Sequence, residues 1–199
     1  MKHSLFQGVK RIALFGVILA ISGAFAACKT DSDPDPGITF KNFINSSGYT
    51  ITVSGSGKAV FDWGGGFGKE TVALADEVEV FPPYTDYAKP YTVTLTGKEI
   101  TELNVNEFHV KSVSIRKMGS LKELMLHSNE LTALNVSACP KLEYLKINDN
   151  NLNGGALNAL FKSLPDRNGK TKGVILFYNN PGESSCELSL LAAKNWEED

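Results

Sequence analysis

The chain has 199 residues, and its 20 Lys and Arg against 22 Asp and Glu give a formal net charge of −2 at pH 7. A mildly acidic chain without a basic cluster argues against nucleic acid as a partner. The length fits one large domain or two small ones.

The first residues have the pattern of a secretory signal. Lys2, Lys10 and Arg11 form a basic head, and the apolar run 12–27 ends in small residues. The run is short for a membrane span, which needs about 20 apolar residues. We therefore predict that residues 1–27 are removed as a signal peptide. The alternative is an N-terminal membrane anchor that stays uncleaved.

The segment Phe25-Ala-Ala-Cys28 resembles the lipobox of bacterial lipoproteins. In that family the signal is cut before the Cys, so the resemblance implies lipidation at Cys28 and membrane attachment through that lipid alone. Residues 28–37 are polar, and we predict a solvated, extended tether there. A calcium loop is the alternative for its aspartates, but the two prolines and the missing downstream Glu disfavour it.

The acidic stretch after Cys28 resembles the surface-export signal of lipoproteins from Bacteroidetes-type bacteria. The resemblance implies a lipid-anchored protein of the outer membrane that is exposed at the cell surface. An orientation toward the periplasm remains the alternative.

Residues 38–97 are rich in β-branched and aromatic residues interrupted by Gly, Pro and Asp. Period-two alternation predicts a strand at 49–53, and the further strand candidates are 59–63, 70–74, 77–81 and 91–95. Short strands separated by turn residues indicate a small antiparallel β-sandwich.

Two segments of this region resemble PKD-like sandwich domains. Phe61-Asp-Trp-Gly64 is similar to their W-G-D-G turn, and residues 84–97 are similar to their closing strand. We expect Trp63 to lie in the core. The glycines of 64–68 could suggest a phosphate loop, but no Lys-Ser/Thr follows them, and a hairpin tip is the prediction. Residues 81–84 are predicted to form a rigid connection, with a sugar-binding aromatic cluster as the alternative.

An apolar pattern recurs every 21 residues from position 100 to position 152. It reads Ile100-x-x-Leu103-x-Val105, then Leu121-x-x-Leu124-x-Leu126, then Leu142-x-x-Leu145-x-Ile147. Asn129 and Asn150 follow in two copies, and Phe108 takes the Asn position in the first. This is the leucine-rich repeat pattern, and it predicts a short solenoid over residues 98–199.

The repeat makes two further predictions. The Asn carboxamides are expected to bond the backbone of the turn after each strand. The same pattern at half period, over 110–118 and 131–139, predicts that the opposite side of each coil is extended or irregular rather than helical.

The end of the chain is predicted to be a cap. Residues 156–164 have the spacing of an amphipathic helix stopped by Pro165, and a polar loop over 166–172 and a strand over 173–178 follow. A final helix is predicted from Ser184 or Ser185 to about Asn195. Residues 156–167 and 178–182 resemble the terminal phrases of short leucine-rich repeat proteins of Bacteroidetes surfaces.

The predicted fold class is therefore mainly β with short helices. It consists of a small antiparallel PKD-like β-sandwich over 38–97, then a short leucine-rich repeat solenoid with a helical C-terminal cap over 98–199.

The chain shows no motif for catalysis, a metal or a cofactor, so we expect no enzyme. Cys139 falls at an inward repeat position and is expected to be a buried thiol. Cys186 is expected in the last helix, and a Cys139–Cys186 disulfide remains the alternative. His127 is expected to be a solvated surface histidine.

The outward face of the repeat strands is the candidate binding site. Its columns are Glu102, Glu123 and Tyr144, then Asn104, Met125 and Lys146, then Asn106, His127 and Asn148. The predicted ligand-binding residues are Glu102, Glu123, Met125, His127, Tyr144, Lys146 and Asn148. We predict noncatalytic binding of a protein or glycan by a monomer. The alternatives are a solvated spacer and a structural or accessory subunit of a cell-envelope complex.

Overall fold

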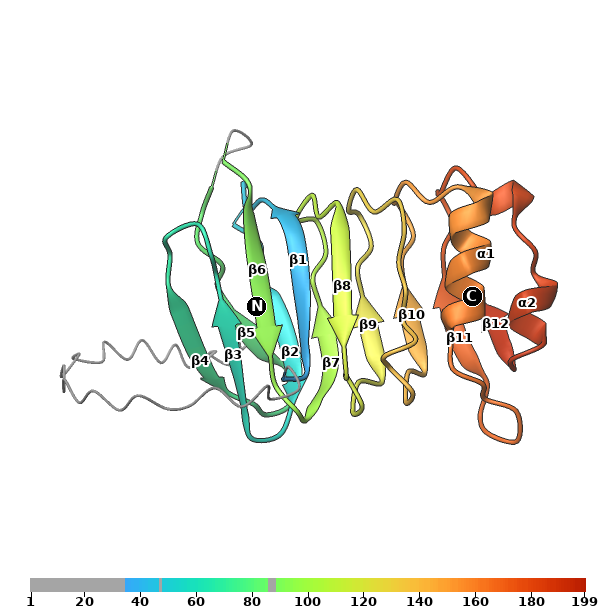
Figure 1. Ribbon diagram of the computed structural model, residues 1–199, viewed down its shortest axis with the longest axis horizontal. Helices are drawn as coiled ribbons and strands as arrows, with labels where there is room; N and C mark the ends of the chain where they lie inside the picture. The colour runs from blue at the N-terminus through green and yellow to red at the C-terminus, as the bar shows by residue number, and fades with distance from the viewer. Residues whose placement is uncertain (1–34, 47, 86–88) are drawn as a thin grey trace, which may run out of the picture. The chain divides into compact units, whose positions relative to one another are not determined.

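The protein is mainly β-structure with a few short helices, and its strands form two sheets (Figure 1). The computed structural model describes residues 35–46, 48–85 and 89–199. The predicted signal peptide, Cys28 and most of the predicted tether lie outside the described residues. All five strands predicted within 38–97 are present, each displaced by no more than two residues at either end.

The first sheet has five strands, and every neighbouring pair in it is antiparallel. In spatial order the strands are β4 (Lys69–Ala73), β3 (Lys58–Asp62), β6 (Tyr91–Thr96), β1 (Gly37–Phe43) and β8 (Ser112–Arg116). Ile38 and Phe40 of β1 are fully buried, while Lys41 is exposed. One face of this sheet therefore packs on the core.

The second sheet has seven strands and mixed pairing. In spatial order they are β12 (Trp196–Glu198), β11 (Gly173–Leu176), β10 (Tyr144–Lys146), β9 (Glu123–Met125), β7 (Ile100–Asn104), β2 (Ile51–Gly55) and β5 (Val78–Val80). The strands from β12 to β7 are parallel to their neighbours, whereas β7, β2 and β5 pair antiparallel. The parallel part contains the three strands of the 21-residue pattern.

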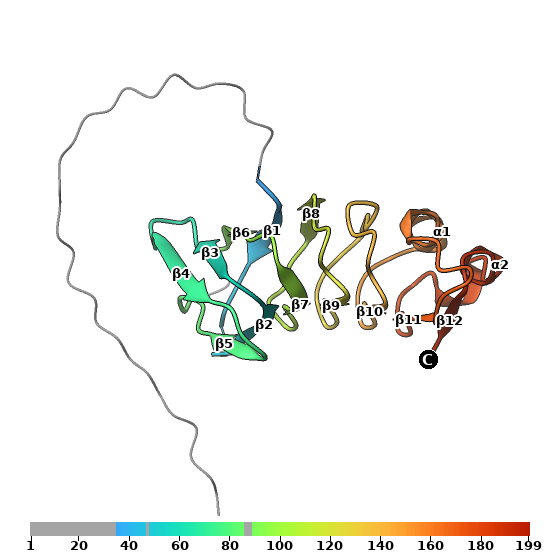
Figure 2. The same ribbon diagram turned by 90° about the horizontal axis from the view of Figure 1, so that it is seen from below.

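The buried side chains of the two sheets form one hydrophobic core among the described residues. Figure 2 shows the backbone of the two sheets as two layers. Strand pairing crosses the predicted boundary between residues 97 and 98 in both sheets, because β1 pairs with β8 and β2 pairs with β7. The segments predicted as two domains are therefore joined by backbone hydrogen bonds. Every described strand finds its partners within residues 34–199, which form one compact unit.

The predicted role of the repeated Asn residues is confirmed. The Asn129 carboxamide accepts from the backbone amides of Phe108 and Val110 at 3.2 and 3.0 Å, and donates to the Val105 carbonyl at 2.8 Å. Asn150 accepts from Leu131 N at 2.9 Å and donates to Leu126 O at 2.9 Å. These bonds satisfy backbone groups that would otherwise be buried without partners.

Asn180 makes the same kinds of backbone hydrogen bonds as Asn129 and Asn150, although the repeat pattern did not predict this role. It accepts from Leu152 N at 3.0 Å and donates to Ile147 O at 3.0 Å. The spacing of 30 residues from Asn150, instead of 21, hides it from a search at fixed period. The intervening residues include α1 (Gly154–Ser163), whose N-cap Asn153 accepts from Ala156 N at 2.9 Å. The predicted helix and its end before Pro165 are confirmed.

The predicted final helix is wrong in extent. The structure has a 3₁₀ turn at Glu183–Ser185, a short α2 (Ser189–Ala192) and the unpredicted strand β12. Neither Ser184 nor Ser185 is a capping residue, and Cys186 is extended with φ −85° and ψ 162°. That extended residue separates the two helical turns.

Trp196 anchors β12 beside β11. Its indole Nε1 donates to Pro165 O at 2.9 Å, and the side chain is 3% exposed. A Cβ at Gly173 would meet the Trp196 ring at 2.4 Å, so only glycine fits under the indole. Tertiary packing, rather than helix propensity, therefore decides the secondary structure of the last residues.

Arg167 lies within the predicted polar loop but is only 5% exposed. Its Nε donates to Thr171 O at 2.9 Å, and its Nη1 donates to Leu142 O at 3.2 Å. Its Nη2 lies 3.4 Å from Glu143 Oε1. The buried guanidinium thus has several partners and ties this loop to the two residues that precede β10.

The structure also tests the predictions for Trp63, for the glycine-rich segment 64–68 and for the two cysteines. Trp63 is 3% exposed and the glycine-rich segment joins β3 to β4, so its predicted core position and hairpin tip are confirmed. Cys139 is buried and Cys186 is half-buried, and both are free, so the disulfide alternative is not formed. No helix among the described residues is long and apolar enough to cross a membrane.

Candidate functional site

The predicted columns of outward side chains are aligned by backbone pairing. Glu102 lies opposite Glu123, which lies opposite Tyr144, and Asn104, Met125 and Lys146 align in the same way. All six are half-buried. The leucines between them, Leu103, Leu124 and Leu145, are fully buried. The strand alternation therefore directs one set of side chains to the core and the other to a continuous sheet face.

The structure extends this face on both sides. Ser54 and Thr52 of β2 lie opposite Glu102 and Asn104, and Val174 and Leu176 of β11 lie opposite Tyr144 and Lys146. We call the outward side chains of β2, β7, β9, β10 and β11 the sheet face. Residues 173–178 were predicted to be a strand, but their continuous apolar run does not show which side chains of β11 point outward. Nothing in the local sequence of β2 shows that it pairs with β7.

One end of the sheet face is hollowed, with a cavity volume of about 530 Å³ between β2, β7 and β9. Its lining includes Thr52, Ser54, Glu77, Glu102, Asn104 and Met125. Ser54 Oγ donates to Glu102 Oε2 at 3.1 Å and accepts from Glu77 N at 3.1 Å. These bonds hold the Glu102 carboxylate in the same hollow as Asn104 and the predicted site residue Met125.

Carboxylates dominate the electrostatics near the centre of this face. Burial, followed by the neighbouring charges of Glu102 and Glu143, raises the pKa of Glu123 above its ordinary value. Burial is also the main cause of the raised pKa of Tyr144, and Asp199 and Glu123 add to it. The Tyr144 phenol therefore stays protonated and able to donate a hydrogen bond at physiological pH. Lys146, which lies beside Met125 in the neighbouring column, contributes a positive charge to this face.

The third predicted column differs from expectation. Asn148 is 2% exposed and donates to Asp149, so it contributes nothing accessible to the sheet face. His127 is half-buried rather than solvated, and its Nδ1 has no hydrogen-bond partner among the described residues. Burial, with Lys146 as a further cause, lowers the pKa of His127, which favours the neutral imidazole. Asn106 donates to Asn104 and remains half-buried.

The accessible part of the predicted site is therefore Glu102, Glu123, Met125, Tyr144 and Lys146, with His127 at its margin. Thioether, phenol, carboxylate and ammonium groups lie together, a combination suited to contact with another molecule's surface. The described residues contain no group of three or more His, Cys, Asp or Glu that could hold a metal ion. Comparisons with protein families, with curated proteins and with solved structures find no match to this chain.

Proposed function

We propose that residues 98–199 form a short leucine-rich repeat solenoid and that residues 38–97 form a PKD-like sandwich. Three parallel strands one 21-residue step apart support the first assignment, together with the buried Asn129 and Asn150 carboxamides after two of them. The antiparallel strands β1 to β6, divided between two sheets over one core, support the second.

On this fold, the protein is a noncatalytic binding protein that recognises a protein or glycan through the sheet face. The observation that carries the proposal is the backbone register that aligns Met125 beside Lys146 and Glu123 beside Tyr144. Parallel strands spaced about 4.8 Å apart hold these side chains at fixed positions without any loop having to order. Little side-chain and backbone freedom is then lost when a partner binds.

The proposed location is the outer surface of a bacterial outer membrane, with the chain anchored through a lipid on Cys28. Its support is the sequence 25–28 and the acidic segment that follows. Metabolic labelling with a radioactive fatty acid tests the anchor. Label should appear in the natural chain and be absent from Cys28→Ser, and equal labelling of both would refute the lipid site.

The binding proposal is tested with the soluble chain that begins at Lys29. It is applied to an array of glycans and to a panel of extracellular-matrix proteins, beside the double variant Met125→Ala/Tyr144→Ala. Leu188→Ala is the matched control, because Leu188 is 52% exposed and lies outside the sheet face. We expect a retained ligand whose binding the double variant loses and the control keeps.

An unchanged affinity in the double variant would remove the sheet face from the proposal. Circular dichroism and the melting temperature of each variant verify that the chain is folded, since both substituted side chains are only half-buried. Binding to no array member but co-purification with envelope proteins would favour the accessory-subunit alternative.

A further inference from the structure

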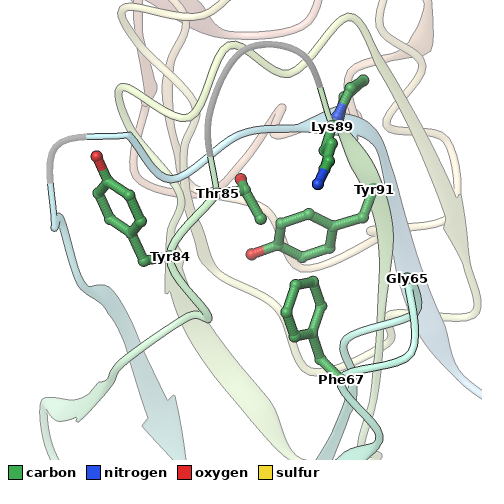
Figure 3. Close-up of a pocket in the computed structure, with 7 residues that line it drawn as sticks. Gly65, Phe67, Tyr84, Thr85, Lys89 and Tyr91 are labelled. Atoms are coloured by element: carbon green, nitrogen blue, oxygen red, sulfur yellow. The ribbon is translucent and has the colours of Figure 1, made fainter.

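A second hollow, of about 520 Å³, is lined by residues that precede the repeat strands in the chain, and it is rich in aromatic side chains (Figure 3). Phe67 of the hairpin tip, Tyr84 and Tyr91 contribute its rings, and Thr85 and Lys89 contribute polar groups. Its volume falls in the range of small-molecule sites, which are mostly apolar with a few polar groups that orient the ligand. None of these residues belongs to the sheet face.

The hairpin tip holds Phe67 in a defined place. Trp63 N donates to Gly68 O at 2.9 Å, and Phe67 N donates to Gly64 O at 2.8 Å, so the loop closes on itself. Gly65 has φ 53° and packs on Tyr91, where an added Cβ would meet the Tyr91 Cβ at 3.1 Å. As a result the Phe67 and Tyr91 rings contact each other with centroids 5.2 Å apart.

The opposite wall is also fixed by hydrogen bonds. Tyr91 Oη donates to Pro83 O at 3.0 Å, and Asn45 Nδ2 donates to Pro82 O at 3.0 Å. Thr85 N donates to Asn45 O at 3.0 Å. Two prolines and these bonds hold the backbone that carries Tyr84, so both walls exist before a ligand arrives.

The aromatic rings on the two walls remain open to solvent. Phe67 is 46% exposed and Tyr84 is 69% exposed, although both border the hollow. In Figure 3 the buried Tyr91 turns its hydroxyl toward the side on which Tyr84 stands. Two exposed rings beside a hollow offer apolar faces to a ligand, and water is displaced from them when it binds.

Three polar groups face the same space. Thr85 Oγ1 accepts from Asn45 N at 3.3 Å, and its own hydroxyl proton can be donated. Lys89 brings an ammonium donor. The Tyr91 oxygen, whose proton goes to Pro83, can accept a hydrogen bond, and burial raises the pKa of this phenol so that it stays neutral.

We infer that this hollow is a carbohydrate-binding site that takes a pyranose unit of a glycan. A pyranose ring presents C–H faces that stack on Phe67 and Tyr84. Its hydroxyls can accept from Lys89 and Thr85 and donate to the Tyr91 oxygen. A proline-rich peptide would also contact aromatic rings, but it carries few hydroxyls to pair with these three groups. This site is independent of the function proposed for the sheet face.

The test uses the soluble chain from Lys29 to Asp199 and its Met125→Ala/Tyr144→Ala variant on an array of neutral and acidic pyranose glycans, followed by calorimetric titration of the glycan that both chains retain best. Phe67→Ala and Tyr84→Ala should each weaken its binding about tenfold or more. Phe81→Ala is the matched control, because Phe81 is 70% exposed on the same connection but does not line the hollow. That control should bind as the natural chain does.

Substitution on the sheet face separates the two sites. Met125→Ala/Tyr144→Ala should leave glycan binding in the aromatic hollow unchanged. The inference is overturned if the folded chain retains no glycan. It is also overturned if Phe67→Ala and Tyr84→Ala bind as tightly as the natural chain, if Phe81→Ala weakens binding equally, or if a proline-rich peptide occupies the site in preference to every glycan.

Discussion

The carboxamides of Asn129 and Asn150, which are 21 residues apart, both donate to the carbonyl oxygen of Leu126, at 3.1 and 2.9 Å. One backbone oxygen thereby joins two successive turns of the chain. Asn150 and Asn180 share Ile147 O in the same way, at 3.1 and 3.0 Å. The buried amides form a continuous series that satisfies the turns and sets the spacing of the strands.

Removing one member of this series should be costly. Asn150→Ala leaves Leu131 N without its partner and also removes one of the two carboxamide donors to Leu126 O. Because unsatisfied buried groups cost roughly 1–3 kcal/mol each, we expect the free energy of unfolding to fall by about 3 kcal/mol. Urea denaturation measures it. Asn151→Ala, at an exposed neighbouring position, should change stability by less than about 0.5 kcal/mol. Equal losses in the two variants would contradict the role of the series.

Phe108 stands where the other two repeats have Asn, and it stabilises the fold in a different way. Its ring is fully buried and stacks on Phe43, with centroids 4.4 Å apart and an interplanar angle of 20°. Phe108→Ala should lower the free energy of unfolding by about 3–5 kcal/mol through the lost burial and the cavity left behind. Phe67→Ala, at a ring that is 46% exposed, should cost far less.

A double-mutant cycle isolates the contact between these two rings. Phe43→Ala and Phe108→Ala together should destabilise less than the sum of the single variants, by about 1 kcal/mol. Strict additivity would show that the rings do not interact energetically. Chemical denaturation of the four chains supplies the four free energies.

The two described thiols should differ in reactivity. Burial raises the pKa of Cys139 to about 12, so almost none of it is thiolate at pH 8. Burial also raises the pKa of Cys186, but that side chain is half-buried and partly accessible. In the chain beginning at Lys29, which lacks Cys28, a thiol reagent should modify Cys186 slowly and Cys139 only after unfolding. Rapid modification of both native thiols would contradict the structure, and Cys186→Ser identifies the reactive site.

Glu123 should make stability depend on pH in a predictable direction. Its pKa in the folded state is raised by burial first and by Glu102 and Glu143 next, so the folded chain holds the proton more tightly than the unfolded chain. Stability from this group is therefore present at low pH and is lost as pH rises through the folded pKa. We expect Glu123→Gln to melt at a higher temperature than the natural chain at pH 7.

That advantage should shrink as the pH falls below the folded pKa of Glu123 and vanish below its unfolded value. Melting temperatures measured from pH 7 to pH 3 test it. Lys122→Gln is the control, because Lys122 is exposed and directly precedes β9. We expect it to give no gain in melting temperature at pH 7. An advantage of Glu123→Gln that grows toward acid would reverse the expected sign.

Local patterns predicted a large part of the structure. Runs of β-branched and aromatic residues between turn residues predicted strands close to 49–53, 59–63 and 91–95, because such side chains fit the half-buried surface of a sheet. The Asn positions were predicted because buried turns need a polar partner. The last helix failed because Cys186 is extended and Trp196 packs on Gly173, and neither feature leaves a periodic signal.

For the candidate sites as well, the sequence predicted the features that depend on local patterns and missed those that depend on tertiary packing. The alignment of Glu102, Glu123 and Tyr144 followed from the repeat spacing, whereas the burial of Asn148 and Arg167 did not. The aromatic hollow is lined by residues of the hairpin tip together with residues 84, 85 and 89–91, whereas the sequence suggested only an aromatic cluster at 81–84 as an alternative. In the structure Phe81 lies outside that hollow, while Phe67 belongs to it.

The sequence by itself determined the approximate positions of the strands within 49–95, the 21-residue register and the alternation of Glu102, Leu103 and Asn104 and their counterparts in the next two repeats, since each depends on neighbours a few residues or one repeat away. The tertiary structure alone decided that β1 pairs with β8 and β2 with β7, that Arg167 is buried, and that Phe67 meets Tyr91. Those contacts join residues distant in the chain. Their energies depend on how whole sheets and loops pack, which no local period records.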